Sequence, residues 1–203
     1  MNKIFLRLFL LGFFVFNPAV GHAEIKTTLL AGGCFWCLQH DMEGVTGVTK
    51  AQSGYAGGGR PNPTYDDYHN LDSSYSVPHL EVVEVQYDTA KITYSELLSQ
   101  FLRKIDPTDG GGQFCDRGAS YRPAIFVFSE QEKQQATRIL AEIKNNLKKN
   151  IAVDVLASAP FWKAEEYHQD YAKKNPIQYK LYRYNCGRDK RVQEIWGTSP
   201  SKK

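Results

Sequence analysis

The sequence has no apolar run long enough to cross a membrane. The run at 8–16 is much shorter than the roughly 20 residues that a spanning helix needs. Lys3 and Arg7 precede it, and the small residues Gly21 and Ala23 follow it before Glu24. A cationic start, a short apolar stretch and a small-residue exit are typical of a secretory signal peptide. We therefore expect residues 1–23 to be cleaved after Ala23 and the protein to be exported to the periplasm; an uncleaved anchor is the alternative.

The sequence also lacks an excess of charge, an internal repeat and a linker. Without Lys3 and Arg7, the 25 basic residues fall to 23, against 22 acidic ones, which is a net charge of +1. Nucleic-acid binding is therefore not expected, because phosphate recognition depends on a basic surface. One domain over 24–203 is expected, with 176–203 as its C-terminal tail, and nothing indicates an oligomer.

A second CxxC pair is missing as well. Cys34 and Cys37 form the single pair, while Cys115 and Cys186 stand alone. This spacing disfavours a zinc site, which usually needs two such pairs or added histidines. An even number of cysteines in an exported chain is compatible with two structural disulfides. A working dithiol at Cys34 and Cys37, or a single reactive thiol, are the other interpretations.

The order of predicted elements favours an α+β fold. Strands are expected near 24–31, 47–58, 79–88, 122–128 and 151–158. Helices are expected near 34–44 and 159–176, and after the capping boxes Thr93/Glu96 and Ser129/Glu132. A long loop at 57–78 is expected between the second and third strands, and loops of that length are usually functional. Short connections favour a two-layer α/β sandwich with a mixed sheet over a doubly wound one.

Cys34 follows Gly32 and Gly33 at the predicted strand-to-helix turn. Glycines allow a sharp turn there, and the free N–H groups and dipole of a helix N-terminus favour an anion. Such a position lowers the pKa of a thiol and raises its reactivity. Cys34 is thus the candidate nucleophile.

Six blocks in order carry a resemblance to a known family. They are AGGCFWC, SGYAGG, NPTYDDY, HLEVVEVQYD, DRGASYRPAIF and PFWKAEEYHQDY. Together they resemble the A-type peptide methionine sulfoxide reductases over about 30–175. The resemblance implies a ferredoxin-like core with long catalytic loops and a coil-rich C-terminal tail. It also implies reduction of methionine (S)-sulfoxide, in proteins or as the free amino acid, without a metal or organic cofactor.

The resemblance implies a role for each matching residue. Cys34 would attack the sulfoxide sulfur, and Glu81, kept protonated by burial, would protonate the oxygen. The polar residues that would hold the oxygen or organise the site are Tyr65, Tyr121 and Asp116. Phe35 and Trp36 would cradle the methyl group. His168 is expected to be a structural histidine.

A second thiol must then remove the sulfenic acid that forms on Cys34. Family members commonly use a cysteine in the C-terminal segment, which points to Cys186; Cys115 and Cys37 are the rivals. A thioredoxin-type dithiol would reduce the resulting disulfide. The rival function is a thiol-disulfide oxidoreductase that uses Cys34 and Cys37 as its working pair. The sequence HNLDSSYSVPHLE, just before and including Glu81, departs from the family pattern.

Overall fold

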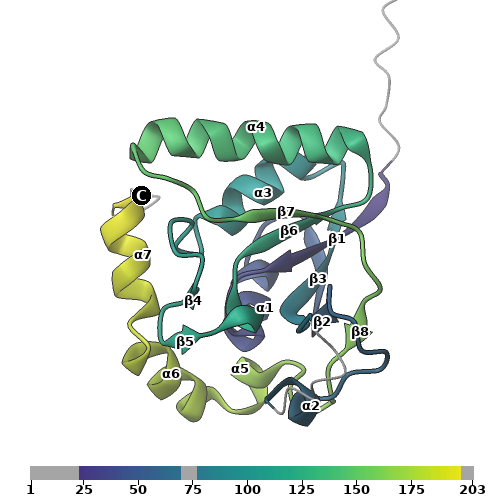
Figure 1. Ribbon diagram of the computed structural model, residues 1–203, viewed down its shortest axis with the longest axis vertical. Coiled ribbons are helices and arrows are strands. Elements are labelled where there is room, and N and C mark those ends of the chain that lie inside the picture. The colour runs from purple at the N-terminus through teal and green to yellow at the C-terminus, as the bar shows by residue number, and fades with distance from the viewer. Residues whose placement is uncertain (1–22, 70–76, 198–203) are drawn as a thin grey trace, which may run out of the picture.

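The computed structural model describes residues 23–69 and 77–197, so the predicted leader lies outside it apart from Ala23. A mixed six-stranded sheet is the centre of the molecule, in the order β7-β6-β1-β3-β2-β8 (Figure 1). Only the β6–β7 pair is parallel among these described strands. The strands are β1 (Ile25–Ala31), β2 (Val48–Ala56), β3 (Leu80–Asp88), β6 (Ala124–Val127), β7 (Asp154–Ala157) and β8 (Trp162–Lys163).

The core has the ferredoxin-like arrangement that the family resemblance implied. Along the chain it runs β1, α1 (Phe35–Glu43), β2, β3, α3 (Tyr94–Leu102) and β6, and in space its strands are ordered β6-β1-β3-β2. This is the β-α-β-β-α-β motif. The α+β prediction with a mixed sheet is confirmed.

The two faces of the sheet carry two apolar clusters. The larger cluster joins Leu30, Val83 and Val85 of the strands to the inner faces of α1, α3 and α4 (Glu130–Leu147). The smaller cluster contains Leu29 and Val82, and residues of the segment after β7 pack against it. Since neighbouring residues of a strand point to opposite faces, Leu29 and Leu30 lie in different clusters.

Both predicted helix starts are found, although only one capping box is complete. Thr93 accepts from the Glu96 amide while Glu96 accepts from the Thr93 amide. Ser129 likewise accepts from the Glu132 amide, but the Glu132 carboxylate accepts from Phe128 instead. Within the predicted long loop, α2 (Tyr65–His69) forms a short helix, and part of that loop lies outside the described residues.

Two predictions for the last third of the chain are wrong. The expected helix at 159–176 is strand β8, turns and the short helix α5 (Tyr171–Lys174). The tail, expected to be rich in coil, forms helices α6 (Pro176–Asn185) and α7 (Arg188–Trp196), which follow the edge of the molecule in Figure 1. Contacts of α7 with the core explain why the tail is helical. Trp196 donates to the Ile105 carbonyl at 3.1 Å, and Arg191 donates to Asp106 at 2.8 Å.

The remaining elements are short. A hairpin of β4 (Gly112–Gln113) and β5 (Asp116–Arg117) stands beside the tail, and a 3-10 turn follows at Ala119–Tyr121. In the part of the chain that the structure describes, every helix is too short or too polar to span a bilayer.

Candidate active site

Cys34 lies at the turn between β1 and α1, as predicted. Its carbonyl accepts the amides of Cys37 and Leu38, at 3.1 and 3.2 Å, so Cys34 caps the helix. Gly33 has φ +79°, and a Cβ there would come within 2.5 Å of the Gln113 side chain. Glycine is therefore required by both backbone conformation and space.

The pKa of Cys34 differs from the prediction. Burial, which leaves 6% of the residue exposed, raises the pKa of this thiol well above its ordinary value. The hydrogen bond to Cys37 raises it further, whereas Tyr182 lowers it. The pKa of Cys37 is instead lowered, first by that hydrogen bond and then by Arg188 and Arg183. The helix N-terminus does not outweigh desolvation, so the expected lowering at Cys34 is wrong for this state of the protein.

Glu81 lies on β3 with its carboxyl group at the N-terminus of α1. It is 2% exposed, and one of its oxygens accepts from the Phe35 amide at 2.8 Å. Burial raises the pKa of Glu81 well above its ordinary value, against the lowering effect of that hydrogen bond; the nearby Asp116 raises it further. Burial thus favours the protonated form of Glu81 beside Cys34.

Tyr65 and Tyr121 form a pair of hydroxyl groups in the same region. Their hydroxyls hydrogen-bond to each other. Burial, followed by the influence of Glu81 and Cys34, raises the pKa of Tyr65 to about 12. Tyr65 therefore stays protonated and able to donate.

Asp116, on β5, is tied to the C-terminal tail. It accepts from the Tyr182 hydroxyl at 2.6 Å, and its carboxylate lies 3.7 Å from the Cys186 sulfur. Burial raises the pKa of Asp116, although the bond from Tyr182 opposes the shift. Tyr182 was missed in the sequence, yet it precedes Cys186 by one turn of α6, so both lie on one face of the helix.

The two aromatic residues after Cys34 have different surroundings. Phe35 is buried, with the Tyr55 and His168 rings at 5.8 and 4.9 Å. Trp36 is half-buried and stacks on Tyr171 at 3.8 Å. Its indole N–H donates to Nδ1 of His168 at 2.9 Å. Trp36 is thereby fixed in orientation.

The four cysteines divide into a bonded pair and a free pair. Cys115 and Cys186 form a disulfide that joins β4–β5 to the end of α6, with their Cα atoms 4.9 Å apart. Cys34 and Cys37 are free and buried. The interpretation with all four cysteines in structural disulfides is therefore wrong.

The family model described as peptide methionine sulfoxide reductase matches residues 26–200. The chain belongs to this family. Peptide methionine sulfoxide reductase MsrA 2 of Caulobacter vibrioides is 48% identical over 181 residues, 89% of this chain and 90% of the relative. The solved structure of methionine sulfoxide reductase A of Corynebacterium diphtheriae superposes with a TM-score of 0.68 at 31% identity, covering 77% of each chain. Mxr1 of Saccharomyces cerevisiae, solved in complex with Trx2, gives 0.51 at 25% identity over 73% of this chain and 86% of that one.

In this methionine sulfoxide reductase the five predicted polar residues converge. Electrostatic interactions connect Glu81 with Cys34 and with Asp116, and Tyr65 with both Glu81 and Cys34. Tyr121 joins through its bond to Tyr65. The Cys34 sulfur, the Glu81 and Asp116 carboxyl groups and the two tyrosine hydroxyls thus lie in one region.

The segment 164–170 positions the reductase site and was largely missed in the sequence. His168 is 1% exposed and burial lowers its pKa, so the neutral ring accepts from Trp36. This agrees with the structural role predicted for His168. Although burial alone would raise the pKa of Glu165, hydrogen bonds from the Tyr65 amide and the Tyr55 hydroxyl lower it. Glu165 therefore anchors the start of α2 as a carboxylate.

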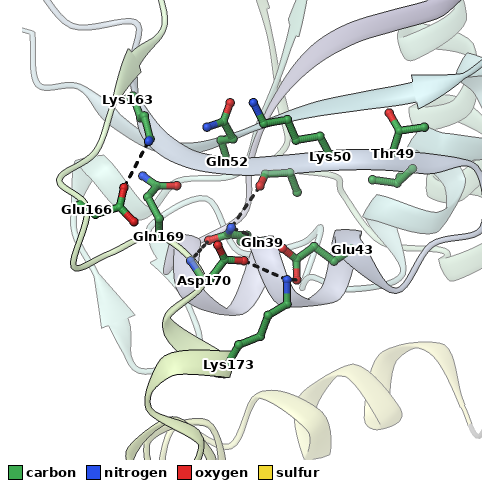
Figure 2. Close-up of a pocket in the computed structure, with 12 residues that line it drawn as sticks. Gln39, Glu43, Thr49, Lys50, Gln52, Lys163, Glu166, Gln169, Asp170 and Lys173 are labelled. Atoms are coloured by element: carbon green, nitrogen blue, oxygen red, sulfur yellow. Dashed lines mark hydrogen bonds and ion pairs between the residues drawn. The ribbon is translucent and has the colours of Figure 1, made fainter.

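A separate polar pocket lies on the side of α1 that carries Gln39 and Glu43 (Figure 2). None of the predicted site residues lines it. Figure 2 shows Gln39 between β2 and the turn at Gln169 and Asp170. Gln169 bonds both backbone groups of Ser53, at 3.1 and 2.8 Å. This network holds the segment 164–170 against β2.

One group of potential metal ligands occurs in 23–69 and 77–197: Cys115, Asp116 and Cys186, with ligand atoms within 4.8 Å of one another. Since the two sulfurs are bonded to each other, neither is available as a thiolate ligand here.

Proposed function

We propose that this chain reduces methionine (S)-sulfoxide, in proteins and as the free amino acid, through a sulfenic acid on Cys34. The observation that carries the proposal is the buried Glu81 carboxyl, whose pKa is raised by burial, at the N-terminus of the helix that Cys34 caps. A sulfoxide gives up its oxygen to sulfur only when that oxygen is protonated, so the acid must lie beside the nucleophile.

In the first step, the Cys34 sulfur attacks the sulfoxide sulfur while Glu81 protonates the oxygen. The oxygen passes to Cys34 as a sulfenic acid, methionine leaves, and the Cys34 thiol proton replaces the one that Glu81 gave. Tyr65 and Tyr121 donate hydrogen bonds to the oxygen, and Asp116 organises the polar side. Phe35 and Trp36 form the apolar wall for the methyl group.

In the second step, Cys186 attacks the sulfenic sulfur, forms a Cys34–Cys186 disulfide and releases water. Cys115 then attacks the Cys186 sulfur, and Cys34 leaves as a thiolate. The product is the Cys115–Cys186 pair, as observed. Cys115 is exposed whereas Cys34 is buried, so this disulfide is the one that an external reductant can attack.

The reductant is a thioredoxin-type dithiol protein. Support comes from the exposed disulfide and from the yeast relative solved with Trx2. Its two thiols become a disulfide as Cys115 and Cys186 become thiols. No step requires a metal or an organic cofactor.

We further propose a signal peptide over 1–23, cleavage after Ala23, a periplasmic location and a monomeric single-domain enzyme over 24–203. In an oxidising compartment the reductant needs electrons delivered from inside the cell. Cell fractionation with N-terminal sequencing tests the leader, and light scattering after size-exclusion chromatography tests the monomer. Cytoplasmic protein that still begins at Met1 contradicts the location.

A second candidate is a thiol-disulfide oxidoreductase that uses Cys34 and Cys37. It is favoured by one observation, the hydrogen bond between the two free thiols that lowers the pKa of Cys37. In this reading Cys115–Cys186 is structural.

One experiment separates the two functions. The fully reduced protein receives one equivalent of methionine (S)-sulfoxide per chain without a reductant, and released methionine and remaining thiols are counted. We expect one methionine per chain and loss of two thiols in the wild type and in Cys37→Ser, and no methionine from Cys34→Ser. Thioredoxin-dependent turnover is lost in Cys186→Ser. Absence of methionine from the wild type contradicts the reductase; turnover that survives Cys34→Ser contradicts the nucleophile.

A further inference from the structure

Arg188 is a buried cation with no part in the steps above. It begins α7, two residues after Cys186, and is only 1% exposed. Burying a guanidinium is unfavourable unless its donors are paired. Its partners therefore show what it holds in place.

The partners of Arg188 lie in the segments that carry the other redox cysteines. Nη1 donates to the Gly32 carbonyl at 3.4 Å, two residues before Cys34. The guanidinium lies over the ring of Phe114, the residue before Cys115, at 4.6 Å from its centroid.

Two further contacts fix the same group. Nη2 donates to the Lys104 carbonyl at 3.0 Å, after α3. Nε lies 3.4 Å from Asp41, on the helix that Cys34 caps, and Arg183 of α6 pairs with the same carboxylate at 3.0 Å. Arg188 thus joins α7 to the Cys34 turn, to the Cys115 hairpin and to α1, whose Asp41 also pairs with Arg183 of α6.

These contacts limit the travel of Cys186. Two residues of chain span at most about 7 Å, so Cys186 stays within that reach of the Arg188 Cα atom. On its other side, Tyr182 bonds Asp116 at 2.6 Å one helical turn earlier. Gly187 is the single residue between Cys186 and Arg188. It has φ +68°, and a Cβ atom added there would have no neighbour within 4 Å among the described residues, its two chain neighbours aside. Gly187 can therefore act as a pivot.

We propose that Arg188 is a positioning residue for the thiol exchange, because it keeps the Cys186 sulfur within reach of both Cys34 and Cys115. The inference rests on the proposed function. Arg188 makes and breaks no bond; Cys186 first bonds Cys34 with release of water, and Cys115 then displaces the Cys34 thiolate. A freely moving tail would have to find both partners by diffusion, whereas a tethered one only turns about Gly187.

The test compares Arg188→Met and Arg188→Lys with Arg191→Gln. Arg191 is a matched control, since it anchors the same helix to Asp106 without contacting the two cysteine segments. After one addition of methionine (S)-sulfoxide to reduced protein, acid quenching and alkylation give two rates: methionine release, and formation of Cys115–Cys186 by mass mapping.

We expect methionine release within about threefold of wild type in all variants. Disulfide formation slows about tenfold or more in Arg188→Met, the scale of one lost charged hydrogen bond, and a dimedone-trappable sulfenic acid accumulates. Arg188→Lys restores part of the rate, and Arg191→Gln resembles the wild type. A merely structural role would alter stability but not this split between the two rates.

A second variant covers the case in which Arg188→Met does not fold. One glycine inserted after Gly187 leaves the Arg188 contacts intact but lengthens the tether, so it should slow disulfide formation and spare methionine release. Wild-type disulfide rates in either folded variant overturn the role of Arg188. Failure of the wild type to release methionine overturns the proposed function instead.

Discussion

At the scale of single residues, the environment of Glu81 decides its chemistry. Glu81 and Glu84 share strand β3, but their odd spacing places them on opposite faces of the sheet. Glu81 is buried with its pKa raised, whereas Glu84 is half-buried. Glu81 is therefore the candidate acid, and Glu84 is a matched control on the same strand.

Glu81→Gln should slow methionine release by about 10²–10⁴-fold, because the amide can still accept from Phe35 but cannot transfer a proton. Glu84→Gln should stay within about threefold of wild type, as expected for a side chain outside the proton transfer. Chromatography of released methionine in single-turnover reactions measures both. A fast Glu81→Gln enzyme rules out the acid role.

The raised pKa of Glu81 also predicts the sign of a pH effect. The folded state binds this proton more tightly than the unfolded state, so the contribution to the free energy of unfolding falls as pH rises above the unfolded value of about 4.3. Denaturant unfolding between pH 4.5 and 8.5 should show a decline that is weaker in Glu81→Gln than in the wild type. The rate of methionine release should fall in the same alkaline direction, because the acid form is lost. Parallel stability profiles for both proteins contradict the assignment.

At the scale of elements, the strand-to-helix turn at Gly32 and Gly33 sets the position of Cys34. The turn places the sulfur at the start of α1 and the Gly33 Cα against Gln113. Gln113 also accepts from the Asp106 amide at 2.8 Å, so it has little freedom to move away.

Gly33→Ala should therefore destabilise the protein by about 1–3 kcal/mol more than Gly197→Ala, the range for overpacking a filled site. Gly197 has φ +71° and ψ 175° with open space around it, so alanine there meets only the strain of a backbone conformation that is almost restricted to glycine, about 1–3 kcal/mol. Urea unfolding of both variants gives the comparison. Equal losses would show that Gln113 yields without penalty.

The C-terminal helices are elements whose formation depends on contacts with the core. Arg188, Arg191 and Trp196 of α7 all find partners on the core, at Gly32, Asp106 and Ile105. The tail is ordered by these long-range contacts rather than by its local pattern, which explains why it was expected to be coil.

At the scale of the whole molecule, the Cys115–Cys186 disulfide closes a loop of 71 residues. It joins the β4–β5 hairpin to the C-terminal end of α6. Arg188, two residues after Cys186, connects this end to the Cys34 turn through its bond to the Gly32 carbonyl. The redox state of this pair should thus affect global stability as well as catalysis.

Reduction of this disulfide should lower the free energy of unfolding by about 4 kcal/mol, the chain-entropy value for a loop of this length. The measurement is denaturant unfolding of oxidised and reduced protein in a Cys34→Ser/Cys37→Ser background, which prevents exchange. Adding Cys115→Ser to that background should abolish the dependence on redox state. Equal stability of the two forms contradicts the prediction.

The sequence alone determined the local features. The glycine turn before Cys34, the helix after it and the capping residue Thr93 depend on neighbouring residues, and all are found as predicted. The family resemblance also placed Glu81, Tyr65, Tyr121 and Asp116 together, because six motif blocks in order specify one fold.

Tertiary structure decided the rest. The pKa of Cys34 depends on burial, which no local pattern reveals, and the partner of Cys186 depends on how β4–β5 meets α6. The roles of Tyr182, Glu165 and Arg188 arise from contacts between segments as distant as Gly32 and Arg188. Desolvation and long-range pairing are properties of the packed chain, and so only the folded molecule contains them.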